Sequence, residues 1–215
     1  MAISAEGGRG AAPPRPRVCV VGAASRDLVP DDPRGWRLGG GVVYGSLALA
    51  RLGLAVVAYV GLDAEAGTAA ELETLARGGV EVRPVPLRRG PIFENREGPR
   101  GRRQRCRAWP EPIPPQFVDP AAVAGAEGWL FAPIAGEVPP DWAAVPDSDA
   151  VVALAWQGLL RRPLPGGRVG RLPPAPNPLL ARADLVGVSV EDLGPDCSLE
   201  SVAALLRPTA TLALT

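Results

Sequence analysis

Short, uninterrupted runs of apolar residues recur along the chain, with segments of helical periodicity between them. Six of these runs cover residues 18–22, 56–60, 129–132, 151–155, 185–188 and 211–214. Their apolar residues do not alternate with polar ones, which is typical of strands buried on both faces of a parallel sheet. The pattern therefore predicts six buried strands.

Helical patterns fill several of the gaps between these strands. Residues 42–52 form one candidate helix, which Gly53 ends, and residues 64–77 form a second, followed by two glycines. Near the end of the chain, Ser198 is placed to cap a helix over residues 199–206. The alternation of strand and helix predicts an α/β fold, a doubly wound and mostly parallel sheet flanked by helices.

One segment departs from this alternation. Residues 83–107 hold nine arginines and two acids, a local net charge of +7. Within it, residues 91–97 and 102–109 flank the sequence GPRG, which predicts a β-hairpin that projects as a small flap. We consider three roles for it: a solvated hairpin, a flap over an anionic ligand, and a nucleic-acid ribbon. The last is not favoured, because Phe93 and Trp109 are the only nearby aromatics.

Composition then limits the possible chemistry. The 215 residues include 26 glycines and 26 prolines, but 47% are hydrophobic, so we expect a globular chain. All 23 basic residues are arginine, and the chain has neither histidine nor lysine. Catalytic triads that use histidine, histidine-ligated zinc, Schiff-base lysines and the P-loop lysine are thereby excluded. Proton transfer would depend on Asp, Glu, Tyr or Cys.

Net charge bears on the possible partners, and cysteine use bears on the cellular compartment. The formal net charge is zero, so no overall field favours nucleic acid or a membrane as partner. Cys19, Cys106 and Cys197 lie far apart without metal-ligand spacing, and we expect free thiols in a reducing compartment. Residues 1–17 lack the apolar core of a signal peptide, and we expect a disordered tail on a cytoplasmic protein.

A glycine-rich turn and an aspartate follow the first strand. Asp27 stands five residues after that strand ends, on the side where ligands bind in open α/β sheets. Gly39, Gly40 and Gly41 precede the first helix, and glycines let the backbone approach a ligand closely. We expect Asp27 to accept hydrogen bonds from the hydroxyls of a polyol, with the turn closing against the same ligand. A second acid, Asp63, follows the next strand in the same way.

Four successive blocks of sequence carry a resemblance to a known family. They are VVGAASRDLV, GGGVVYGSLALARLG, VAYVGLDAEAG and GGVEV, starting at residues 20, 39, 57 and 78. In order and spacing they resemble the N-terminal signature of ribokinase-like (PfkB-type) carbohydrate kinases. VVALAWQGLLR from residue 151 and ADLVGVSVEDL from residue 183 fall at the D-x-N/Q-x-x-x-R and N-x-x-E motifs of that family. GEVP at residues 136–139 and Gln157 look most like the branch that contains myo-inositol 3-kinase.

The resemblance implies roles for residues near the acceptor. Asp27 matches the aspartate that holds sugar hydroxyls, and Gly39 and Gly40 match the di-glycine turn, which is also a lid hinge. Gly41 and Tyr44 stand where many members have Lys and Asn, so the substrate is not simply ribose. The same resemblance implies substrate contacts for two further residues, Phe93 and Gln157.

It also implies a donor site and a domain organisation. Arg161 and Ser189 would bind nucleotide phosphate, and Asp192 would help to hold Mg²⁺, with ATP as the donor. Ser189 and Asp192 replace the family Asn and Glu, and both are shorter or weaker ligands. Residues 18–215 would form one incomplete ribokinase-like domain, with a lid hairpin over about 83–112.

The resemblance implies no catalytic residue within these 215 positions. The family base is the Asp of a GAGD motif that follows the strand ending at Thr215, and no GAGD occurs in the sequence. We expect either a truncated product of a longer gene or a short paralogue, with an open sheet edge that exposes apolar surface. Whether the lid makes a homodimer stays open.

Two functions follow from these expectations. The first is an ATP-dependent kinase that transfers a phosphoryl group to a hydroxyl of a sugar or cyclitol. The second is a non-catalytic ligand-binding or interaction module on a degenerate kinase fold. Neither involves a membrane, and nucleic acid is not favoured as a partner.

Overall fold

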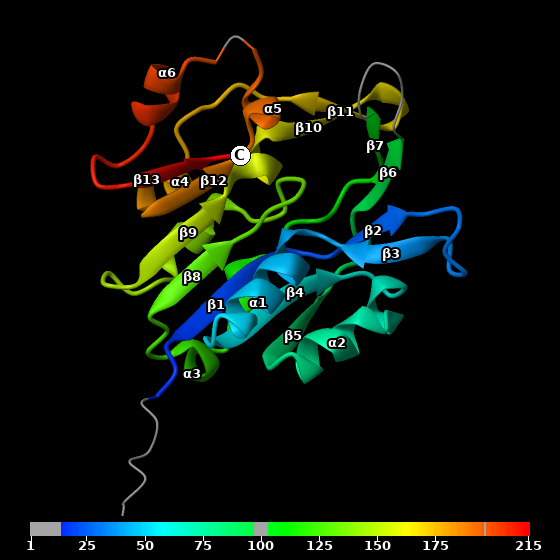
Figure 1. Ribbon diagram of the computed structural model, residues 1–215, viewed down its shortest axis with the longest axis horizontal. Helices are drawn as coiled ribbons and strands as arrows, with labels where there is room; N and C mark the ends of the chain where they lie inside the picture. Colours follow the sequence, from blue (N-terminus) through cyan, green and yellow to red (C-terminus); the bar gives the residue numbers. More distant parts are fainter. Residues whose placement is uncertain (1–13, 97–102, 196) are drawn as a thin grey trace, which may run out of the picture.

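A seven-stranded parallel sheet forms the centre of the molecule (Figure 1). The computed structural model describes residues 14–96, 103–195 and 197–215. The strands, in spatial order, are β13 (Thr211–Leu214), β12 (Leu185–Val188), β9 (Val151–Ala155), β8 (Gly128–Phe131), β1 (Arg17–Ala23), β4 (Ala55–Leu62) and β5 (Val80–Pro86). Every neighbouring pair is parallel, so the predicted α/β class is confirmed, and so are all six predicted strands.

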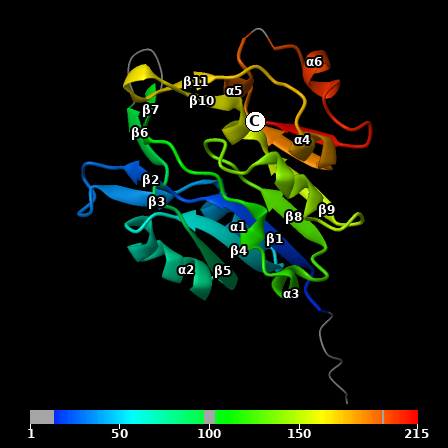
Figure 2. The ribbon, with the colours of Figure 1, turned by 180° about the vertical axis from the view of Figure 1, so that it is seen from behind.

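Helices and short helical turns connect and cover the strands (Figures 1 and 2). The helices are α1 (Gly41–Arg51), α2 (Glu71–Arg77), α3 (Pro120–Val123), α4 (Pro178–Arg182), α5 (Val190–Leu193) and α6 (Leu199–Ala203). The 3₁₀ turns are η1 (Ala66–Thr68), η2 (Pro115–Phe117), η3 (Pro140–Ala144), η4 (Trp156–Leu160) and η5 (Pro165–Gly167). The helix expected over 42–52 is confirmed.

The other two predicted helices are shorter than expected. The segment 64–77 divides into η1 and α2, because Ala69 between them is extended. At the end of the chain, Ser198 caps α6 as expected, since its side chain accepts a hydrogen bond from the Ser201 amide. That helix ends at Ala203 rather than at Leu206.

Successive residues of the central strands pack into two separate cores. On β1, Cys19 and Val21 belong to one cluster and Val20 to the other, as the two-residue period of a strand requires. Helices α1 and α2 contribute Val42, Leu75 and neighbouring residues to the cluster around Val20. The opposite cluster is built against η3, α4 and α6. Burial on both faces explains why the strand sequences are apolar throughout.

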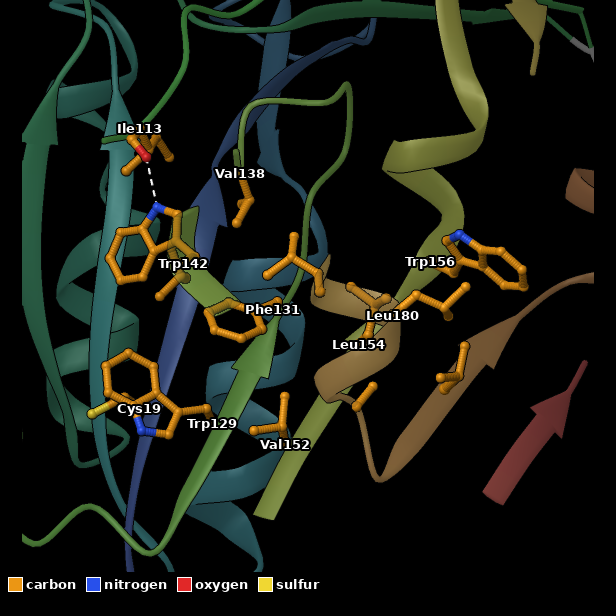
Figure 3. Close-up of a cluster of buried hydrophobic side chains, with 14 of the residues drawn as sticks. Cys19, Ile113, Trp129, Phe131, Val138, Trp142, Val152, Leu154, Trp156 and Leu180 are labelled. Carbon is orange, nitrogen blue, oxygen red and sulfur yellow. Dashed lines mark hydrogen bonds between the residues drawn. The ribbon is translucent and has the colours of Figure 1, made fainter. Parts of the chain in front are cut away.

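Aromatic side chains organise the larger of these clusters. Trp142 of η3 is fully buried, and its ring lies 6.1 Å from that of Phe131 and 6.2 Å from that of Trp129 (Figure 3). Its indole Nε1 donates a hydrogen bond to the carbonyl of Ile113 at 2.6 Å. A buried tryptophan needs such a partner, and this bond ties η3 to the segment that follows the hairpin.

A second sheet lies beyond the carboxyl ends of several central strands (Figure 1). In spatial order its strands are β10 (Arg161–Leu164), β11 (Arg168–Arg171), β7 (Arg103–Ala108), β6 (Ile92–Arg96), β2 (Ser25–Leu28) and β3 (Trp36–Gly39). Strands β6 and β7 form the predicted hairpin, whose turn at 98–101 lies outside the described residues. The hairpin is not an isolated flap, because it continues a six-stranded sheet. Of the expected tail, residues 1–13 also lie outside the described part.

One half of the main sheet has a bare face. Val151 of β9 and Leu185 of β12 are 60% and 42% exposed, on the side that α1 covers farther along the sheet. They border an apolar groove of about 900 Å³, together with Ala48 and Leu130. The expectation of exposed apolar surface is therefore confirmed for this face. Among the described residues, no helix is both apolar enough and long enough to cross a bilayer.

Candidate active site

The sequence-predicted residues gather at the carboxyl edge of the main sheet. Asp27 follows β1, Gln157 follows β9 and Ser189 follows β12, and these three strands run parallel in one sheet. Parallel strands end at a common edge, and this edge is where open α/β sheets bind ligands. The fold therefore places residues that are up to 165 positions apart on one side of the molecule.

The β2–β3 hairpin positions Asp27 beside the glycine turn. Ser25 pairs with Gly39 in the ladder, and the Ser25 hydroxyl donates to Asp27 Oδ1 at 2.8 Å. A Cβ built on Gly39 would lie 2.3 Å from Asp27 Oδ2. The carboxylate thus uses the space that a side chain at Gly39 would need, and the residues that the sequence grouped at this turn lie side by side.

The next two glycines join the hairpin to α1. Gly40 has a φ of +104°, and a Cβ there would lie 2.8 Å from the carbonyl oxygen of Ala23. Gly41 begins α1, close to Ala132 after β8. The backbone of the turn therefore packs directly against the backbone at the ends of β1 and β8. At position 40, only glycine permits this close approach together with a positive φ. Tyr44, one turn later, is 64% exposed, and its proposed contact with substrate stays a prediction.

Phe93 and Arg161 connect this half of the site to the other half. Phe93 of β6 is paired with Asp27 in the parallel β2–β6 ladder and is 1% exposed. The guanidinium of Arg161 lies 5.6 Å from the centre of the Phe93 ring, within the range of a cation–π contact. Arg161 also donates to the Ile134 carbonyl at 3.2 Å and lies 3.9 Å from Asp192 Oδ1.

Asp192 is the centre of the second half of the site. Its Oδ2 accepts hydrogen bonds from the Ser189 hydroxyl at 2.6 Å and from Gln157 Nε2 at 2.9 Å. Ser189 is the N-cap of α5, and its oxygen accepts from the Asp192 amide at 3.1 Å. The serine hydroxyl thus caps the helix and at the same time donates to the acid three residues later. Gln157 lies with these residues instead of beside Asp27.

A small polar cavity of about 230 Å³ lies between these side chains. Its lining includes Gln104, Gln157, Arg161, Arg171, Ser189, Glu191 and Asp192. Two guanidinium groups, amide and hydroxyl donors and two carboxylates thus face a space large enough for a phosphate chain. Arg171 comes from β11, which the sequence did not connect with the site, and Gln104 comes from β7 of the predicted lid hairpin but was not itself predicted.

Glu137 is a further residue that the site prediction missed. It is 1% exposed, and its carboxylate accepts hydrogen bonds from the amides of Ala23, Ile134 and Ala135 at 2.8 to 3.0 Å. Burial raises the pKa of Glu137 above its ordinary value. The carboxylate ties the end of β1 to the loop after β8, and the carbonyl of Ile134 in turn holds Arg161. The GEVP string was the available signal, because an acid between apolar segments needs buried partners.

Asp63, the other acid after a strand, has a structural role. Its carboxylate accepts hydrogen bonds from Arg26 at 2.8 Å, from the Ala66 amide at 2.8 Å and from the Gly90 amide at 3.2 Å. Burial acts to raise the pKa of Asp63, but these donors outweigh it and hold the pKa below its ordinary value. The carboxylate therefore fastens the turn after β4 to the loop before β6.

A flap over an anionic ligand would turn the hairpin arginines toward this site, but they do not face it. Cys106 of β7 is buried beside Phe93, and Gln104 of the same strand lines the polar cavity. Because side chains alternate along a strand, the arginines at 103, 105 and 107 point to the opposite side. Among the described residues of the hairpin, the charge that suggested a flap over an anion lies on the outer face.

Comparison with known proteins identifies the architecture. No protein-family model matches the chain, and no curated protein matches its sequence. Among solved structures, a pyrophosphate-dependent kinase in the ribokinase family, complexed with a pyrophosphate analog and myo-inositol, is 21% identical with a TM-score of 0.71. The match covers 92% of this chain and 72% of that one.

Two further structures agree in fold. An uncharacterized sugar kinase from Pyrococcus horikoshii is 13% identical with a TM-score of 0.61, over 93% of this chain and 70% of that one. A fructokinase from Xylella fastidiosa is 17% identical with a TM-score of 0.56, over 82% and 60%. At these identities the similarity establishes the fold, so the resemblance to ribokinase-like carbohydrate kinases noted in the sequence is confirmed at the level of architecture.

Proposed function

We propose that this chain binds a small sugar or cyclitol and ATP, as a kinase that transfers a phosphoryl group to one hydroxyl of the acceptor. The observation that carries the proposal is the continuous path from Asp27 through Phe93 and Arg161 to Asp192. One end of the path offers a carboxylate beside a glycine turn, and the other offers a polar cavity. An acceptor and a donor bound at these ends would meet near Arg161.

Asp27 is the proposed anchor of the acceptor. A carboxylate accepts hydrogen bonds from two neighbouring hydroxyls, and charged acceptors make the stronger bonds. Gly39 leaves room for the Asp27 carboxylate, and Gly40 lets the turn pack against Ala23. Gly41, Tyr44 and Phe93 complete the proposed acceptor pocket. Holding the hydroxyl in line with the donor supplies much of the rate enhancement in phosphoryl transfer, because the transition state demands little covalent help from the protein.

The donor phosphates are proposed to bind in the polar cavity. Arg161 and Ser189 would hold phosphate oxygens, with Gln157 keeping the Asp192 carboxylate in position. ATP is the proposed donor, and pyrophosphate is the alternative that the first structural neighbour uses by its description. Arg161 would also stabilise the charge that moves between donor and acceptor.

Asp192 fits the proposed magnesium ion. Both hydrogen bonds to its carboxylate reach Oδ2, whereas Oδ1 lies 3.9 Å from Arg161 and accepts no hydrogen bond from these residues. Magnesium sites in phosphoryl-transfer proteins use one or two carboxylates together with substrate phosphates and waters. A bound ion would neutralise phosphate charge, and Asp192 would orient it.

We propose that residues 18–215 act as one ribokinase-like domain in the cytoplasm. The three cysteines are free thiols, which supports a reducing compartment. The segment 83–112 is proposed as the lid, and its inner face carries Phe93, Gln104 and Cys106 toward the site.

Calorimetric titration with myo-inositol, ATP and pyrophosphate tests the proposal. We expect Asp27→Asn to weaken myo-inositol binding by at least about tenfold while ATP binding persists, because only the acceptor loses its carboxylate. Asp141→Asn, an exposed aspartate in η3, is the matched control. Equal myo-inositol affinity in both variants would overturn the role of Asp27. Binding without a phosphorylated product from either donor would exclude catalysis by this chain.

A further inference from the structure

Six arginines lie on the outer face of the second sheet, on its neighbouring strands β10, β11, β7 and β6. Figure 1 shows these four strands at one end of the sheet. The arginines are Arg96, Arg103, Arg105, Arg107, Arg162 and Arg168, and we call this surface the arginine face. All six are exposed. They come from four strands, and two of them lie about 60 positions after the hairpin in the sequence.

Alternation along the strands assigns these side chains to one side. Gln104 of β7 and Val169 of β11 line the polar cavity, and Cys106 is buried against Phe93. The arginines at positions 103, 105 and 107 of β7 therefore point away from the site, and so does Arg168 of β11. On β10, Arg162 is paired with Gly170, and a Cβ on Gly170 would touch the Arg162 side chain at 3.2 Å. Arg162 thus shares the outer side with Arg168.

The ladder places arginines directly opposite each other. Arg96 is paired with Arg103 between β6 and β7, and Arg105 is paired with Arg168 between β7 and β11. Directly opposite side chains of an antiparallel pair have Cβ atoms about 4.5 to 5.5 Å apart, and like charges in such pairs are destabilising. The fold therefore concentrates positive charge here at some loss of stability.

Among the described residues, one carboxylate, that of Glu94, pairs with arginines of this face. Glu94 accepts a hydrogen bond from Arg107 Nε at 2.8 Å and forms an ion pair with Arg96. Among the described residues, Arg103, Arg105, Arg162 and Arg168 have no carboxylate within salt-bridge distance. Arg168 Nε donates to the Pro165 carbonyl at 3.5 Å. Most of the donors of these four guanidinium groups are thus available to an anion from outside the chain.

We propose that the arginine face binds a short, carboxylate-rich segment of another protein. Arginines at i and i+2 on β7 are about 6.8 Å apart, and an extended segment with alternating Asp or Glu presents carboxylates at the same spacing. Each carboxylate can accept two parallel hydrogen bonds from one guanidinium. Pro163 lies in the edge strand β10 and lacks an amide hydrogen, so the segment would lie across the face instead of extending the sheet.

Net charge favours a short acidic segment over nucleic acid. The whole chain has a net charge of zero, so surfaces outside the arginine face carry the compensating negative charge. A duplex extends beyond the face and meets those charges, whereas a short acidic segment keeps its carboxylates within about a Debye length, roughly 8 Å, of the arginines. The face also carries no aromatic residue on which bases could stack.

Fluorescence anisotropy with a labelled octaglutamate peptide tests the proposal. We expect binding at low salt that weakens as salt is added, and a loss of affinity of about tenfold or more in the double variant Arg105→Gln/Arg168→Gln. The control is Arg51→Gln/Arg77→Gln, which removes two exposed arginines at helix ends. Equal affinity in both double variants would overturn the proposal.

A stability measurement separates this role from a structural one. Arg168→Glu places an acid opposite Arg105, so we expect the midpoint of thermal unfolding to rise by up to about 4 °C while octaglutamate binding falls. A fall in both would indicate a structural role and overturn the proposal. Tighter binding of a 20-base-pair DNA duplex than of octaglutamate would assign the face to nucleic acid instead. A concentration-dependent dimer that Arg168→Glu dissociates would assign it to a second copy of this chain.

Discussion

Asp27 Oδ2 occupies the position next to Gly39 that a side chain would need, at 2.3 Å from where the Cβ would be. The two residues lie on neighbouring strands of one hairpin, and Ser25 holds the other carboxylate oxygen. The Asp27 carboxylate can therefore lie here only because residue 39 has no side chain. Any substitution at Gly39 thus acts on the proposed acceptor side of the site through Asp27.

Gly39→Ala is expected to displace the Asp27 carboxylate while the sheet still forms. The new methyl group cannot remain 2.3 Å from Oδ2, and the flexible aspartate side chain is the group that would move. We expect myo-inositol affinity, measured by calorimetry, to fall by at least about tenfold. Gly187→Ala is the control, because a Cβ on that strand glycine meets nothing within 4 Å. Unchanged affinity in Gly39→Ala would show that Asp27 does not need its present position.

Glu137→Gln is expected to destabilise the fold by about 1 to 3 kcal/mol, because one acceptor oxygen becomes a donor that faces amide N–H groups. The affected donors are the amides of Ala23, Ile134 and Ala135. Urea unfolding followed by tryptophan fluorescence measures the loss. The exposed Glu127→Gln should stay within about 0.5 kcal/mol of the original protein. An equally small effect at Glu137 would mean that its carboxylate is not required for the loop.

Glu71 gives a stabilising contribution that depends on pH. Arg34 donates two hydrogen bonds to its carboxylate, at 2.9 and 2.6 Å, and these lower the pKa of Glu71 from 4.5 to about 2. An acid with a depressed pKa in the folded state stabilises the fold above its ordinary pKa, and this stabilisation is lost as pH falls through the folded value.

The corresponding measurement compares Glu71→Gln with the original protein. The difference in unfolding free energy should be present at pH 5 and above and should disappear as pH falls from 4.5 toward 2. Glu73→Gln on the same helix is the control, since no arginine lies within salt-bridge distance of it among the described residues. A difference that does not change with pH would contradict the ion pair.

The three thiols are expected to react at different rates with a thiol-specific reagent. Burial raises the pKa of Cys19 to about 12 and that of Cys106 to about 11, and the thiolate is the reactive form. Cys197 is partly exposed. At pH 8 we therefore expect one thiol per chain to react quickly and all three to react after denaturation. Two fast thiols in the folded protein would show that the hairpin or β1 opens.

Local sequence patterns were sufficient to predict most strands of the main sheet. The apolar runs predicted six of its strands within a residue or so, because strands buried on both faces need apolar side chains throughout. The seventh strand of this sheet, β5, was not among them, because Glu81 and Arg83 interrupt its apolar pattern. Its outer position in the sheet explains those charges, as an edge strand keeps exposed positions.

Site residues were predicted where they follow a strand and were missed where they depend on contacts across the fold. Asp27, Ser189 and Asp192 lie just after strand ends, so their place at the carboxyl edge follows from chain order. Arg171 and Gln104 reach the cavity through β11 and β7, which pair only in the folded chain. The GEVP string gave a signal for Glu137 but not its link to β1, because the Ala23 amide lies 114 positions away in the sequence.

The sequence by itself determined the order of strands and helices, the chemistry that histidine and lysine cannot supply here, and the grouping of Asp27 with the glycine turn. These are properties of short segments, set by periodicity and by residue type. Only the tertiary structure decided which way the arginines of the hairpin face. That direction depends on the pairing of β7 with β6 and β11, and a shift of one residue in the register would turn every side chain to the other face.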